Sequence, residues 1–256
     1  MYQPLVMTED RPDDIKARVR RRVRVRPEER LIFDHVRLRG ADFSKRKVLQ
    51  LSSVGSRFES CRFDGSRIEG ASFGSGGELS EYLDSTFDRC RIRFDAGDYF
   101  RFVRCSFTRV ELRDWISFRG ELVDCVFTGR LKTAIFNGTV PEEDQARLMR
   151  TQNEFHDNDF SGAELVNVTF RTGIDLTKQR LPTGNDYFFL ENAGDALIRA
   201  RSKVLRWTQL EERRRALAFI QALKYEVEGG QRQVFVRRDD FPGSRDEALR
   251  FFDLLG

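Results

Sequence analysis

The sequence predicts a mainly β fold of stacked repeats, followed by an α-helical C-terminal region. The first observation is a row of positions five residues apart, a period that neither an α-helix nor a flat strand has. This row is Phe33, Leu38, Phe43, Val48, Ser53, Phe58, Phe63, Ile68 and Phe73, and eight of the nine residues are apolar. The second observation is a parallel row two positions earlier, where small or aliphatic side chains prevail. The third is the change to helical spacing in the last part of the chain.

The five-residue pattern returns in a shifted frame from Phe87 to Phe127 and again from Phe155 to Phe170. The segments GADFSKR (40–46), SCRFDGSRIEGASF (60–73) and SGAEL (161–165) resemble the pentapeptide-repeat family, whose pattern is Ala, then Asp or Asn, then Leu or Phe, then two polar residues. The resemblance implies a right-handed quadrilateral β-helix with four pentapeptides in each coil. Residues twenty apart should then stack at the inter-strand spacing. We therefore expect Phe43 to stack on Phe63, and Phe87, Phe107 and Phe127 to form one ladder.

We predict three parts of the chain. Residues 1–30 form a basic arm or cap, 31–180 form the β-helix with insertions at 74–84 and 128–152, and 181–256 form a mostly helical domain. Within the last part we expect helices over about 190–207 and from 208 to the glycines at 229 and 230, a short strand in QVFVR, and a final helix. Thr208 with Glu211, and Ser244 with Glu247, have the spacing of capping boxes.

The N-terminal arm holds the densest charge cluster. Residues 1–30 carry 9 Lys or Arg against 6 Asp or Glu, whereas residues 31–127 carry 16 against 15. The clustered arginines are Arg18, Arg20, Arg21, Arg22, Arg24 and Arg26. One interpretation is a strand that covers the open end of the β-helix, and the other is a salt-sensitive contact with phosphates or an acidic partner.

Further candidate interaction residues lie in the insertions and the helical domain. They are Glu78, Glu81 and Asp84 in the first insertion, Glu142 and Glu143 at a predicted helix start in the second, and Arg213, Arg214 and Arg215 in the helical domain. Insertions into a repeat fold often form its binding face. Packing over the repeat is the alternative for both insertions, and a solvent-exposed helix face is the alternative for the three arginines.

The cysteines, histidines and calcium-like loop, which could suggest catalysis or metal binding, are explained by their positions in the repeat. Cys61, Cys90, Cys105 and Cys125 all occupy the small inward position, so we expect packed thiols rather than a metal or redox site. His35 and His156 should point outward without a nucleophile beside them. The half calcium loop at 157–162 has Val168 where the closing glutamate belongs. No catalytic residue, metal or cofactor is therefore predicted.

These observations favour a non-catalytic scaffold that binds a macromolecule, most simply a protein. One alternative is binding and protection of DNA gyrase by partial DNA mimicry, as in some members of the family, although the balanced charge does not resemble an acidic duplex mimic. The second is nucleic-acid or anionic-surface binding through the arginine arm. A homodimer could form through the C-terminal helices. No secretory signal or membrane-length apolar run is recognisable, so a cytoplasmic location is expected.

Overall fold

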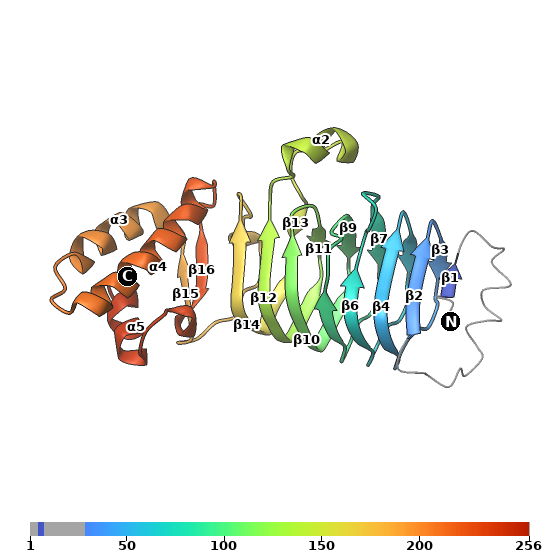
Figure 1. Ribbon diagram of the computed structural model, residues 1–256, viewed down its shortest axis with the longest axis horizontal. Helices are drawn as coiled ribbons and strands as arrows, with labels where there is room; N and C mark the ends of the chain where they lie inside the picture. Colours follow the sequence, from blue (N-terminus) through green and yellow to red (C-terminus); the bar gives the residue numbers. More distant parts are fainter. Residues whose placement is uncertain (1–4, 8–28, 256) are drawn as a thin grey trace.

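The computed structural model describes residues 5–7 and 29–255, which form a parallel β-solenoid followed by a helical region (Figure 1). The predicted fold class is confirmed: the chain is mainly β, and its strands stack coil upon coil. The arginine arm at residues 18–26 lies outside the described residues. Within the described part, no helix is both long and apolar enough to cross a membrane.

Two parallel sheets run along the solenoid. The strands of the larger sheet are β1 (Leu5–Met7), β2 (Glu29–Asp34), β4 (Lys47–Val54), β6 (Arg67–Ser72), β8 (Arg91–Phe94), β10 (Ser106–Ser117), β12 (Val126–Asn137) and β14 (Asp159–Arg171), in that spatial order. Those of the smaller sheet are β3 (Arg37–Arg39), β5 (Arg57–Glu59), β7 (Ser80–Leu83), β9 (Phe100–Val103), β11 (Glu121–Val123) and β13 (Phe155–His156). Each strand thus pairs with its equivalent in the next coil. At the N-terminal end of the larger sheet, β1 pairs with β2 in parallel.

The predicted stacking is confirmed. The rings of Phe43 and Phe63 are stacked with centroids 5.2 Å apart, and both the Phe87–Phe107 and Phe107–Phe127 pairs have centroids 4.8 Å apart. All four cysteines are buried and free, as expected. The five-residue period therefore corresponds to a continuous aromatic core.

Both insertions are shorter than predicted. Residues 128–137 belong to β12, where Leu131 and Phe136 are buried, so the second insertion begins only after Asn137. The pattern hides this continuation because Leu131 follows Phe127 by four residues, and the register with β10 shifts at the same place. In the first insertion, residues 80–83 form β7 and place Tyr82 in the core.

The second insertion holds the helix α2 (Glu142–Leu148), which stands above the solenoid in Figure 1. The C-terminal elements are the short 3-10 helix η1 (Leu176–Lys178), β15 (Tyr187–Leu190), α3 (Ala193–Val204), α4 (Leu210–Glu228), β16 (Val234–Arg237), the 3-10 helix η2 (Arg238–Asp240) and α5 (Arg245–Phe252). β15 and β16 form a separate antiparallel pair, and β15 was not expected.

The two predicted capping boxes differ in outcome. Ser244 caps α5, since its Oγ accepts a hydrogen bond from the Glu247 N–H at 3.2 Å. The box at Thr208 is wrong, because Gln209 occupies the N-cap of α4 and makes no side-chain cap bond. The glycine stop is confirmed, with Gly229 at the C-cap.

The helical region closes the last coil. Four of its side chains accept hydrogen bonds from backbone N–H groups there: Tyr187 Oη from Leu165 (3.0 Å), Asp240 Oδ1 from Asn167 (3.1 Å), Gln231 Oε1 from Gly173 (3.0 Å) and Gln233 Oε1 from Leu176 (2.6 Å). Open strand edges recruit further strands and cause aggregation. These side chains accept the hydrogen bonds of the N–H groups at this edge without adding a new strand that would itself face solvent.

Candidate interaction surface

The two insertions meet at Tyr99, a residue that the repeat pattern does not connect with either of them. The Tyr99 carbonyl accepts a hydrogen bond from Ser80 N (2.8 Å), and the Tyr99 N–H donates to Gly74 O (3.2 Å). A Cβ atom placed on Gly77 would lie 2.2 Å from Arg147 Nη1 of α2. The first insertion and α2 therefore form one continuous surface around Tyr99.

Asp144 fastens α2 to the solenoid. Its carboxylate is buried and accepts hydrogen bonds from the Tyr99 hydroxyl (2.6 Å) and from Arg119 Nε. The Arg119 guanidinium also lies over the Tyr99 ring, 5.1 Å from its centroid. These contacts lower the pKa of Asp144, with the Tyr99 hydrogen bond as the largest cause. At neutral pH the carboxylate is thus charged and fully engaged.

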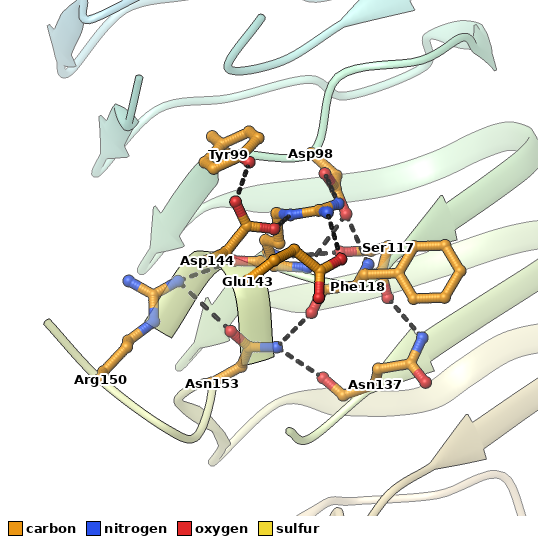
Figure 2. A network of polar contacts seen from close by, with 11 residues as sticks. Asp98, Tyr99, Ser117, Phe118, Asn137, Glu143, Asp144, Arg150 and Asn153 are labelled. Atoms are coloured by element: carbon orange, nitrogen blue, oxygen red, sulfur yellow. Dashed lines mark hydrogen bonds and ion pairs between the residues drawn. The ribbon is translucent and has the colours of Figure 1, made fainter. Parts of the chain in front are cut away.

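Asp98, which Figure 2 shows near Tyr99 and Asp144, contacts the same guanidinium as Asp144 does. Its Oδ2 accepts hydrogen bonds from the N–H groups of Phe118 (2.5 Å) and Arg119 (3.0 Å), and its Oδ1 lies 3.3 Å from Arg119 Nη1. Charge-assisted hydrogen bonds of this type are among the strongest in proteins. Two carboxylates from separate segments therefore fix one guanidinium.

Asn153 and Arg150 fix the return from α2 to β13. Asn153 Nδ2 donates to the carbonyls of Phe118 and Asn137, both at 2.8 Å. Arg150 Nη2 donates to Arg119 O at 2.7 Å, and its Nε lies 3.2 Å from the buried Glu121 carboxylate. Burial raises the pKa of Glu121. We call this set of contacts around Asp98, Asp144 and Asn153 the clamp.

The outer side of α2 is exposed. Glu142, Glu143 and Arg147 face solvent, and Met149 at the helix C-cap is 87% exposed. Met149 has φ 54°, a left-handed conformation that is uncommon for residues other than glycine. An apolar side chain is thus presented on a base that the clamp holds in place.

The predicted residues of the first insertion and of α4 make ion pairs, with the exception of Arg213. Glu78 Oε2 lies 2.6 Å from His35 Nε2, Glu81 lies 2.7 Å from Arg57, and Asp84 lies 2.7 Å from Arg104. In α4, Arg214 pairs with Glu211 (3.0 Å) and Arg215 with Glu247 (2.8 Å), while Arg213 Nη1 lies 3.4 Å from Trp207 O. Glu142 and Glu143 are the predicted residues on α2, and Glu143 reaches to 3.9 Å from Arg119.

No side-chain group in the described chain resembles a metal site of three or more His, Cys, Asp or Glu residues. Burial raises the pKa of the Cys61 and Cys105 thiols, and that of Cys90 to about 12. His35 is exposed between Asp34 Oδ1 (2.5 Å) and Glu78. The thiols of Cys61, Cys90 and Cys105 therefore stay protonated at neutral pH and pack in the core.

Compared with models of known protein families and with curated proteins, the chain gives no match.

Sequence reasoning missed the clamp residues Tyr99, Asp98 and Arg119. One signal was available: Asn153 falls at an inward position of the repeat, where an amide must find buried hydrogen-bond partners. The partners themselves, the carbonyls of residues 118 and 137, could not be read from the spacing because the insertion separates them from Asn153.

Proposed function

We propose that this chain is a non-catalytic scaffold of the pentapeptide-repeat type, and that it binds a protein partner through the surface formed by α2 and the first insertion. The repeat segments and the stacked aromatic core support the family assignment. The pairing of each strand with its equivalent in the next coil also agrees with it.

The observation that carries the proposal is the contrast between the base and the tip of α2. The base is fixed by buried charge-assisted hydrogen bonds to Asp144, whereas Met149 is left almost wholly exposed. Rigid elements bind with a smaller loss of conformational entropy than mobile ones. Methionine also adapts its shape to an apolar pocket. A partner with an apolar pocket beside basic groups would complement Met149, Glu142 and Glu143.

The absence of catalysis is part of the proposal. The thiols that can act as nucleophiles are buried, with raised pKa values at Cys61, Cys90 and Cys105. His35 is exposed, and its ring nitrogens contact the carboxylates of Asp34 and Glu78. Such groups favour a structural role over nucleophilic chemistry.

The gyrase alternative has weaker support. Duplex mimicry needs carboxylates that face a partner in place of phosphates. Asp64 Oδ1 instead accepts a hydrogen bond from Asp88 N (3.0 Å), and Asp88 Oδ1 accepts from Ser106 Oγ (2.6 Å) and Thr108 N (2.9 Å). These acidic residues are engaged in holding neighbouring coils together.

A homodimer through the C-terminal helices stays a prediction. Ile198, Leu205, Leu210 and Tyr225 are large apolar residues exposed in this region. Sedimentation equilibrium of the full chain, with Ile198→Asp as the variant, would measure any dimer and its dependence on this surface.

Site-specific photo-crosslinking in the cells of origin tests the scaffold proposal. A photoreactive residue at position 149 should capture a defined protein, and Met149→Asp should abolish binding of the purified partner. The matched control is position 49, because Leu49 is also apolar and 42% exposed but lies on β4, away from α2 and from the C-terminal helices. Equal capture from both positions, or full binding by Met149→Asp, would contradict the proposal.

A further inference from the structure

The outer face of the central strands β6, β8, β10 and β12 carries an excess of basic side chains, although the chain as a whole is nearly neutral. Six basic side chains line one hollow there: Arg67, Arg91, Arg93, Arg113, Arg130 and Lys132. The acidic residues that line it are Glu69 and Glu111, so cations outnumber anions by six to two. The hollow has a volume of about 320 Å³. We call this surface the cationic face.

The alternation of each strand produces this segregation. Ile68, Ile92 and Leu112 point inward and are buried, so the residues on either side of them point outward. The inter-strand register then stacks these outward residues in rows along the solenoid. A charge count along the sequence combines the residues of this face with those of the other faces, so it does not reveal the excess of cations here.

Several basic residues on this face are direct cross-strand neighbours. In register, Arg67 lies beside Arg91, Arg93 beside Arg113, and Arg113 beside Lys132. Like charges directly opposite one another destabilise a sheet. An anionic ligand that spans the rows would remove this repulsion.

Only part of the charge is neutralised within the protein. Four of the six cations pair with a carboxylate: Arg67 with Glu69 (2.5 Å), Arg91 with Glu111 (3.1 Å), Arg93 with Asp95 (2.9 Å) and Arg130 with Glu164 (2.6 Å). Arg113 and Lys132 make no ion pair with any residue that the structure describes. These two side chains are therefore available to an external anion.

We infer that the cationic face binds the phosphate backbone of double-stranded nucleic acid, without reading its sequence. The rows of cations repeat with the coils, about 4.8 Å apart, and so match an extended polyanion better than a single small anion. Arginine binds phosphate in a bidentate manner. No aromatic side chain lines the hollow, so the stacking platform typical of single-strand binding is missing from it.

Charge reversal on the cationic face provides the test. Binding of the full-length protein to a fluorescent DNA duplex is measured by anisotropy over about 50–200 mM salt. The test variant is Arg113→Glu with Lys132→Glu. The control is Arg199→Glu with Lys203→Glu on α3, which changes the net charge equally and also replaces two exposed residues.

The inference predicts that the test variant binds the duplex at least about ten-fold more weakly, with a salt dependence shallower by about two phosphate contacts. The control should bind as the wild type does. Because every protein keeps the arginines at 18–26, the comparison isolates the cationic face. Circular dichroism melting shows whether each variant is folded, and Arg113→Gln with Lys132→Gln repeats the test without introducing acidic groups.

Three results would overturn the inference: no duplex binding by the wild type at low salt, equal weakening of test and control variants, or tighter binding to another polyanion. Poly-glutamate represents an acidic protein, and phosphatidylserine vesicles represent a membrane surface. Preference for either at the same ionic strength would assign the face to that class of partner. None of these measurements involves Met149, so the protein-binding proposal is tested separately.

Discussion

The rings of Phe87 and Phe107 lie one coil apart and are stacked with centroids 4.8 Å from each other and planes 6° apart. The same contact continues from Phe107 to Phe127 and from Phe127 to Phe160, at 4.8 and 4.6 Å. Phe107 and Phe127 therefore each have an aromatic neighbour above and below. Stability in such a stack depends on contacts between successive coils.

Replacing Phe107 by alanine should destabilise the solenoid strongly. The ring is fully buried, and its removal leaves a cavity between two stacked rings, so we expect a loss of about 3–5 kcal/mol in the free energy of unfolding. Urea denaturation monitored by circular dichroism would measure it. Phe118→Ala is the control, since Phe118 is 43% exposed and should cost much less. Similar losses for both variants would argue against a core governed by this stack.

The period-five pattern predicted the Phe107 contacts because an inward position recurs once per coil wherever no residue is inserted or deleted. It failed beyond Phe127, where the next buried residue is Leu131 and the register slips. The period-five pattern could not predict the clamp for another reason. Tyr99 and Asp144 are 45 residues apart, and their contact depends on how an irregular insertion folds back. Local spacing carries no information on that path.

Loosening the clamp should free α2 while leaving the solenoid folded. Tyr99→Phe removes the hydroxyl that donates to Asp144, and Asp144→Asn removes the charge that pairs with Arg119. We expect several-fold faster proteolysis within residues 142–149, with little change in the melting of the β-sheets. Glu142→Gln is the control, because Glu142 is exposed. Unchanged cleavage in both clamp variants would show that other contacts hold α2.

The clamp should also resist acid. The pKa of Asp144 is lowered, first by the Tyr99 hydrogen bond and also by Arg119. Its contribution to stability is therefore present above the unfolded pKa of about 3.9 and is lost as the pH falls through the lower folded pKa. Proteolysis by pepsin across the acidic range should release α2 only below the usual range of carboxyl titration. Release of α2 near pH 5 would contradict this prediction.

His35 should make the first insertion more firmly held at mildly acidic pH. Its pKa is raised, mainly by hydrogen bonds with Asp34 and Glu78, and Glu78 belongs to the insertion. The stabilisation is fully present below the unfolded pKa of about 6.5 and is lost as the pH rises through the higher folded pKa. Wild type should therefore exceed His35→Gln in melting temperature at pH 6, by a margin that shrinks at higher pH. His156→Gln, whose ring contacts the adjacent Asp157, is the control, and a margin independent of pH would refute the assignment.

Gln231 should be essential for docking the helical region onto the last coil. Its side chain is 1% exposed, accepts from Gly173 N (3.0 Å) and donates to the carbonyls of Ile174 (2.9 Å) and Gln233 (2.8 Å). Gln231→Leu has nearly the same size but leaves these backbone groups buried without partners. Each such group costs about 1–3 kcal/mol.

We expect Gln231→Leu to lower the unfolding free energy and to expose the edge of β14, so that aggregation rises with protein concentration. Chemical denaturation and light scattering measure the two effects. Gln221→Leu is the matched control, because Gln221 is the same residue type on an exposed position of α4. Loss of stability without aggregation would mean that the edge of β14 stays covered when the hydrogen bonds of Gln231 are broken. The remaining contacts of Tyr187 and Asp240 would then be what prevents edge pairing.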